Sequence, residues 1–117
     1  MHSFLNDYSE GAHPNVLQAL TESNLRQTCG YGLDPDCQKA ADLIRKLCNA
    51  PDAAVHFLVG GTQTNLVAID ALLKPYEAVI AASTGHVSRH ETGAIEASGH
   101  KVCTVSAPDG KLTPELV

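Results

Sequence analysis

Short runs of strand-forming residues that alternate with amphipathic segments are the feature that most restricts the fold of this chain. The runs occupy residues 53–59, 78–82 and 101–106. Between them, residues 62–73 carry apolar side chains with the spacing of one helical face, and residues 91–97 predict a further helix. Strands and helices that alternate in this way predict an α/β fold with a mainly parallel sheet and flanking helices.

Two further helices are predicted nearer the N-terminus, and each begins at a proline. Pro14 opens a segment whose apolar residues recur on one helical face, which predicts a short helix. Asp34 followed by Pro35 is a typical pair of cap and first helical residue. The amphipathic pattern that follows predicts a helix that continues to about Asn49.

The end of the sequence also bears on domain organisation. A helix start at Thr113 and Pro114 is followed by only a few residues before Val117. A helix nucleus without further turns has little reason to form, so we expect a fragment of a longer chain. We predict that residues 1–34 form an N-terminal segment with loops, and that residues 35–117 begin a larger domain that is truncated here.

The charge distribution restricts the possible partners. Thirteen acidic residues exceed eight basic ones, and no basic run or basic helical stripe occurs. Nucleic acids and anionic membranes are therefore not expected as partners. No stretch approaches the roughly 18 apolar residues of a membrane helix, and the N-terminus lacks the features of a secretion signal. We expect a cytoplasmic protein without a membrane segment.

Neither the cysteines nor the histidines predict a metal site. No two cysteines are spaced as C-x-x-C or as typical zinc ligands. His86 and His90 form an H-x-x-x-H pair beside Glu91, which could place two imidazoles on one helical face. A third ligand at suitable spacing is missing, and the sequence departs from H-E-x-x-H at its last position. We predict no metal and four reduced thiols: Cys29, Cys37, Cys48 and Cys103.

The strongest local signal for ligand binding is Gly60-Gly61-Thr62, between a predicted strand and a predicted helix. Glycines let the backbone approach a phosphate, and the first N–H groups of the helix can bind its oxygens. Thr62 adds a hydroxyl. The loop is neither G-x-G-x-x-G nor a P-loop with its lysine, so a single phosphate fits better than a dinucleotide or a nucleoside triphosphate. The alternative is a plain turn with Thr62 as the helix cap.

His86 is the second candidate for a ligand-binding residue. It follows the predicted strand 78–82, at the carboxyl edge of the sheet, where ligands bind in open α/β folds. An imidazole there can stack on an aromatic cofactor or transfer protons. The alternative is an ordinary loop histidine that is bonded to solvent.

Four segments resemble the low-specificity threonine aldolases of the β-eliminating lyase family in their order and spacing. They span nearly the whole chain: Asn6 to Pro14, Tyr31 to Asp34, Gly60 to Asn65, and His86 to Ala94. The resemblance implies the aspartate-aminotransferase-like type I fold of enzymes that use pyridoxal 5′-phosphate (PLP), with this chain as part of the large domain. It also implies active sites at the subunit interface of a homodimer or homotetramer.

The resemblance further implies roles for individual residues. Gly61 and Thr62 match the residues that bind the cofactor phosphate. His86 matches the histidine that stacks on the pyridine ring and assists proton transfer. Tyr31 matches a loop that approaches the active site, and Glu91 matches an acidic residue with a structural or supporting role.

Two departures from the family pattern concern the substrate and the cofactor. The family carries a serine that helps to hold the substrate carboxylate where this chain has Asn6, whose amide can donate the same hydrogen bond. The exact substrate is therefore open. The lysine that bonds covalently to PLP is expected beyond Val117, with the aspartate for the pyridine nitrogen and the arginine for the substrate carboxylate. The chain alone is expected to be inactive.

For the complete protein, the resemblance implies a PLP-dependent aldehyde-lyase. It would cleave threonine or a related β-hydroxy-α-amino acid to glycine and an aldehyde. One alternative is another type I PLP enzyme, a β-eliminating lyase or an aminotransferase, since the loop and the histidine do not determine which bond breaks. The other is a non-catalytic truncated module that dimerises or binds a partner.

Overall fold

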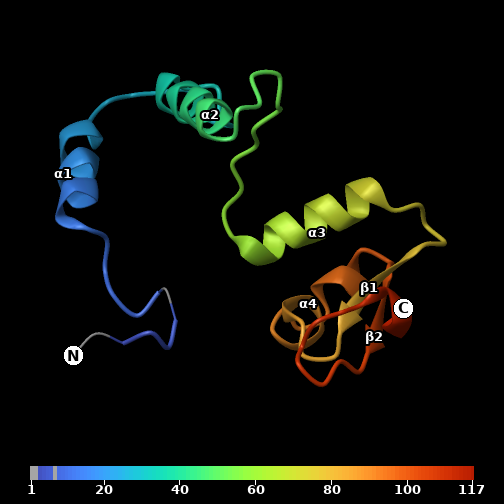
Figure 1. The fold of residues 1–117 in the computed structure, drawn as a ribbon. Coiled ribbons are helices and arrows are strands. Elements are labelled where there is room, and N and C mark those ends of the chain that lie inside the picture. The colour runs from blue at the N-terminus through green and yellow to red at the C-terminus, as the bar shows by residue number, and fades with distance from the viewer. Residues whose placement is uncertain (1–2, 7) are drawn as a thin grey trace. The chain divides into compact units, whose positions relative to one another are not determined.

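The computed structural model describes residues 3–6 and 8–117, and the chain forms two compact units, Met1–His56 and Phe57–Val117. Asp7, which belongs to the first family-like segment, lies outside the described residues. The first unit contains α1 (Pro14–Ser23) and α2 (Pro35–Leu47) (Figure 1). The second contains α3 (Gly61–Leu72), β1 (Ala78–Ala82), α4 (His86–Arg89), α5 (Ala94–Ala97), β2 (Lys101–Val105) and the 3-10 helix η1 (Pro114–Leu116). The predicted division after residue 34 concerns a larger protein and stays a prediction.

Both helices of the first unit begin where the sequence predicts. Helix α1 starts at the expected proline, and Nδ1 of His13 accepts a hydrogen bond from the backbone N–H of Asn15 at 3.2 Å. Helix α2 starts at Pro35, and the Asp34 carboxylate accepts a hydrogen bond from the backbone N–H of Cys37 at 2.8 Å. These bonds satisfy N–H groups that have no partner inside the helix.

The second unit is built on a two-stranded parallel sheet. Strands β1 and β2 pair in register from Ala78 opposite Lys101 to Ala82 opposite Val105. The backbone N–H of Ser83 donates to the carbonyl of Val105 at 2.8 Å, just past the end of β1. A parallel pair needs a crossover connection, which α4 and α5 provide here. The predicted α/β class with parallel strands is therefore confirmed.

The core of the second unit consists of small side chains around one isoleucine. Ile95 on α5 is fully buried, and α5 contacts both α3 and β2. Ala81 and Ala82 of β1 and Ala107 after β2 are also buried. Only the last two residues of β1 are buried, so the carboxyl end of this strand packs in the core.

Residues 53–59 do not form the predicted strand. The segment has no regular secondary structure, and Phe57 and Val59 are 48% and 94% exposed. A strand needs a neighbour that satisfies its backbone N–H and C=O groups. In the described part of the chain β1 and β2 pair only with each other, so this run has no partner.

The helix predicted over residues 91–97 is shorter than expected, because only Ala94–Ala97 are helical. Helices α4 and α5 are separated by a turn in which Thr92 and Gly93 have φ values of 51° and 80°. Residues in this left-handed region cannot continue a right-handed helix. The turn leaves Glu91 between the two short helices, where its side chain points into the protein.

Two other observations concern the cysteines and the helices. Cys29, Cys37, Cys48 and Cys103 are free in the structure. Among the described residues, no helix combines the length and the apolar character needed to cross a membrane.

Candidate active site

The N-terminus of α3 presents backbone N–H groups in an open position. Gly60 is the cap residue, with extended backbone (φ −176°, ψ 169°), and no side chain caps the helix. The expectation that Thr62 could serve as the cap is wrong, because Thr62 lies inside the first helical turn. The N–H groups of the first turn have no acceptor within the helix. They point outward along the helix axis and form the positive end of the helix dipole. Such a terminus can bind the oxygens of a phosphate.

The glycines of this loop are not required by the fold. A Cβ placed on Gly60 or Gly61 would meet no atom within 4 Å, and neither residue has a left-handed φ. Gly85 provides a contrast, because a Cβ there would lie 2.9 Å from the carbonyl oxygen of Ala82. Space beside Gly60 and Gly61 is therefore free for an atom group that does not belong to the described residues.

A hydrogen-bonded turn after β1 positions His86. The backbone N–H of Gly85 donates to the carbonyl of Ala82 at 2.7 Å, and the Ser88 hydroxyl donates to the same oxygen at 3.2 Å. Nε of Arg89 donates to the carbonyl of Ser83 at 2.9 Å. His86 is the first residue of α4, and its side chain is 62% exposed. The imidazole is thus held by its backbone while its ring stays accessible to a ligand.

Glu91 connects His86 to α3. Its side chain is fully buried, and its Oε1 lies 3.4 Å from Nε2 of His86. The same Oε1 accepts a hydrogen bond of 2.6 Å from Nδ2 of Asn65, on α3. Residues three and four apart share a helix face, so Asn65 lies one turn along the helix from Gly61 and Thr62, on the same face. These contacts therefore link the first turns of α3 to His86.

One atom of this site has no partner. Oε2 of Glu91 is buried and makes no hydrogen bond to any described residue. A buried carboxylate oxygen without a donor costs free energy, so such atoms in native proteins mark functional positions or missing partners. The unpaired oxygen singles out Glu91 as more than a surface acid.

The histidine pair does not form a metal centre in this structure. The ring centroids of His86 and His90 are 5.4 Å apart, with a tilt of 42° between the planes. No group of three or more His, Cys, Asp or Glu residues with the geometry of a metal site occurs among residues 3–6 and 8–117.

Asn6 and Tyr31 lie in the first unit, whereas Gly61, Thr62 and His86 lie in the second. Oδ1 of Asn6 accepts hydrogen bonds from the backbone N–H of Tyr8 at 3.1 Å and from the Ser9 hydroxyl at 2.6 Å. These bonds engage the carbonyl side of the amide and leave its NH₂ group as the available donor. Tyr31 is fully exposed and has a left-handed φ of 61°. Their predicted substrate-binding roles remain predictions.

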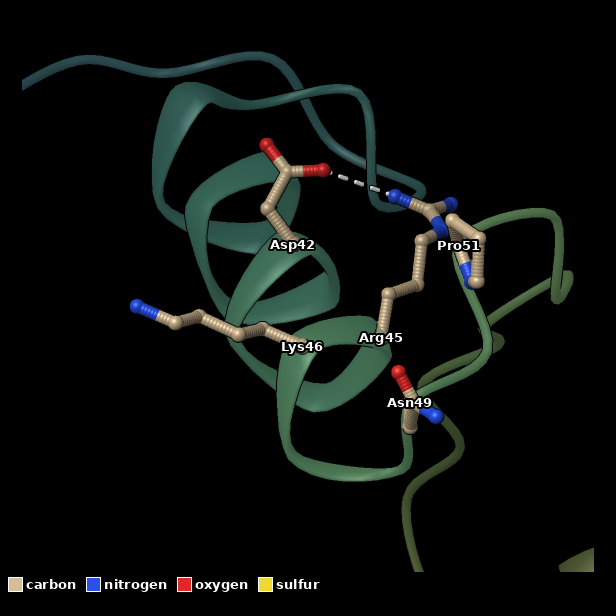
Figure 2. A pocket seen from close by; sticks show the side chains of 5 residues that line it. All are labelled: Asp42, Arg45, Lys46, Asn49 and Pro51. Atoms are coloured by element: carbon tan, nitrogen blue, oxygen red, sulfur yellow. Dashed lines mark hydrogen bonds and ion pairs between the residues drawn. The ribbon is translucent and has the colours of Figure 1, made fainter.

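The first unit also contains a hollow of about 380 Å³, lined by Asp42, Arg45, Lys46, Asn49 and Pro51 (Figure 2). Figure 2 shows the guanidinium of Arg45 turned toward the carboxylate of Asp42. Nη1 of Arg45 lies 2.8 Å from Oδ1 of Asp42. Nε of Arg45 donates to the carbonyl of Ala53 at 2.8 Å. The Arg45 side chain thus stabilises the turn after α2. None of the four family-like segments contributes a residue to this hollow.

Asn65 is the site residue that sequence reasoning missed. It was part of a family-like segment but had no assigned role, and Glu91 had only a supporting one. Their contact joins positions 26 residues apart, and helical periodicity carries no information about such a pair. The one signal in the sequence that could have indicated this contact is that Asn65 and Glu91 both lie in family-like segments.

Comparison with known proteins identifies the family. Residues 4–117 match the family model of the β-eliminating lyases. The chain is 36% identical over 116 residues to the low specificity L-threonine aldolase of Pseudomonas sp. (strain NCIMB 10558) and 35% identical to that of Pseudomonas aeruginosa. It covers 33% of the length of each, so it spans about a third of these relatives.

A solved structure agrees with this result. The structure of threonine aldolase from Leishmania major is 56% identical in sequence, with a TM-score of 0.92. The match covers 99% of this chain and 34% of that one. The described fold is therefore the corresponding part of a type I PLP fold, and the chain belongs to the β-eliminating lyase family.

Proposed function

We propose that the protein carrying this chain is a PLP-dependent aldehyde-lyase that cleaves threonine or a related β-hydroxy-α-amino acid to glycine and an aldehyde. The observation that carries the proposal is the open glycine turn at the start of α3, linked through Asn65 and Glu91 to an accessible His86. The names of the relatives point to the same reaction, because both Pseudomonas proteins are low specificity L-threonine aldolases.

In this proposal the N-terminus of α3 holds the phosphate of the cofactor. The backbone N–H groups of the first turn donate to the phosphate oxygens, and the free space beside Gly61 lets the group approach the backbone. The Thr62 hydroxyl, which is exposed, adds a donor. A phosphate anchored at this point restricts the orientation of the attached pyridine ring, which is the contribution of positioning to catalysis.

His86 provides the second contact. Its exposed ring would lie against the face of the pyridine and take up or release a proton as the bond between the α and β carbons breaks. The PLP ring, when bound, supplies the electron sink for this chemistry. Asn6 and Tyr31 are proposed to contact the substrate, Asn6 through its free NH₂ group.

The proposed function is tested on the natural protein that contains this sequence. Purified protein is incubated with PLP and separately with threonine, serine and an aromatic amino acid. Glycine, aldehyde, 2-oxo acid and ammonia are then quantified. We expect equimolar glycine and acetaldehyde from threonine, with no 2-oxobutyrate.

Other products would favour the remaining interpretations. Formation of 2-oxobutyrate and ammonia from threonine would identify β-elimination. Transfer of the amino group to an added 2-oxo acid would identify an aminotransferase. Absence of any turnover, together with absence of PLP binding, would contradict the enzyme proposal and favour a non-catalytic module.

We also propose a homodimer or homotetramer and a cytoplasmic location. The exposed Tyr31, in a loop that resembles a family segment near the active site of a neighbouring subunit, supports the oligomer. Light scattering coupled to size-exclusion chromatography measures the subunit number, and fractionation of the source cells tests the location.

A further inference from the structure

We propose that Glu91 is a positioning residue that holds His86 in the tautomer with its proton on Nε2, and that Asn65 holds Glu91 in turn. The catalytic consequence rests on the proposed lyase function. The tautomer itself is a property of this chain and can be measured without any reaction. Glu91 thereby gains a specific role beyond that of a structural acid.

The geometry gives the direction of this interaction. A carboxylate oxygen only accepts hydrogen bonds, so the nitrogen that faces it is favoured when it carries a proton. The nitrogen that faces Oε1 of Glu91 is Nε2 of His86, at 3.4 Å. This separation is longer than an ordinary hydrogen bond, and contacts of catalytic groups often shorten when the ligand binds.

The burial of Glu91 makes the interaction effective. The carboxylate is fully buried, whereas the imidazole is 62% exposed, so the pair has one fixed member and one member that can reach a ligand. Water competes little for the carboxylate, and charges interact more strongly where water is excluded. The hydrogen bond from Asn65 at 2.6 Å fixes the position of Oε1 relative to α3.

A defined tautomer determines which atom of His86 can accept a proton. With Nε2 protonated, the lone pair of the neutral ring is on Nδ1, so Nδ1 is the atom that takes up a proton during turnover. The imidazolium formed in this way keeps its Nε2 proton directed at the Glu91 carboxylate. The proton gained at Nδ1 is released from the same atom, so no other reactant is needed.

Nuclear magnetic resonance tests the tautomer directly. The protein is labelled with ¹⁵N at histidine, kept free of PLP and studied at a pH where the imidazoles are neutral, and the signals of His86 are assigned by their loss in H86N. We expect two-bond and three-bond correlations that place the proton on Nε2. In E91L, which has no acceptor, we expect a mixture of the two tautomers.

Two matched variants separate the shape of the residue from its charge. In E91Q, the amide oxygen can accept from both Asn65 and His86, while the NH₂ group occupies the position of the unpaired Oε2. We expect E91Q to fold and to keep the Nε2-protonated tautomer. E96Q removes the same charge at an exposed position on α5 and should change neither tautomer nor turnover.

Kinetics on the PLP-loaded protein provide the second readout. Removing a group that orients a functional histidine typically costs about 10- to 100-fold, as for the partners of metal-binding histidines. We expect kcat of E91L to fall by this factor, with a smaller fall for E91Q and little change in KM for either.

Each outcome decides the proposal. A wild-type His86 with its proton on Nδ1, or a tautomer ratio that is the same in wild type and E91L, would overturn it whatever the enzyme does. If E91L does not fold, the wild type and folded E91Q decide: a proton on Nδ1 of His86 in either protein would overturn the proposal. If the tautomer behaves as expected but threonine is not cleaved, the positioning role of Glu91 stands and the proposed function fails.

Discussion

Replacing Gly61 with alanine separates what the fold requires from what a ligand requires. The added Cβ would meet no atom within 4 Å, and Gly61 is the first residue of α3 without a left-handed φ. Alanine is favoured over glycine in helices by up to about 1 kcal/mol, and by less at the first turn. We therefore expect the ligand-free G61A variant to be as stable as the wild type or slightly more stable.

PLP binding should respond in the opposite direction. In the proposed site, the methyl group occupies the space through which a phosphate oxygen approaches the backbone. The loss of one hydrogen bond to a charged group costs about 1.5–3 kcal/mol. At about 1.4 kcal/mol per factor of ten, this loss corresponds to a PLP affinity that is about 10- to 150-fold weaker.

Two measurements and one control make this prediction decisive. Thermal unfolding of the ligand-free protein reports stability, and titration of the natural protein with PLP, followed by the absorbance of the bound cofactor, reports affinity. G11A is the control, because Gly11 also has free space around it but lies outside the proposed site. The reasoning is refuted if G61A binds PLP as tightly as the wild type, or if the ligand-free variant is clearly less stable.

Three further predictions concern the cofactor, the core and a helix cap. T62V should bind PLP about 10- to 150-fold more weakly, because it loses one hydroxyl donor to the charged phosphate, with normal stability, as measured by the same titration. I95A should lower the free energy of unfolding by about 2–4 kcal/mol in urea, since Ile95 is fully buried; a loss below about 1 kcal/mol would contradict its place in the core. The Cys37 thiol and backbone N–H bonded to Asp34 lower the pKa of that carboxyl below its ordinary value of 3.8. The ionised Asp34 cap therefore stabilises α2 fully above pH 3.8, and this stabilisation is lost as the pH falls through the lowered pKa. Circular dichroism should accordingly show a loss of helix in the wild type at acid pH. D34N should lose less helix over the same acid range, and an equal loss in both proteins would refute the assignment.

The local elements could be predicted from the sequence because their causes are local. The prolines that open α1 and α2, the Asp34 cap and the apolar periodicity of α3 all act over a few residues. The sites at which β1 and β2 form follow from short apolar runs, and the parallel arrangement follows from the helices between them. Gly61, Thr62 and His86 stood out for the same reason, since each follows a predicted strand.

The tertiary structure decided the features that depend on distant partners. Residues 53–59 carry the composition of a strand, but among the described residues they pair with no other strand. The free space next to Gly61 is visible only when every neighbouring atom is in place. The contact of Asn65 with Glu91, and of Glu91 with His86, needs the turn at Thr92 and the packing of α5 against α3. By itself, the sequence determined where helices and strands begin and which residues are candidates, because those signals are short-range. Only the fold determined which candidates share one site, because that depends on packing between segments far apart in the chain.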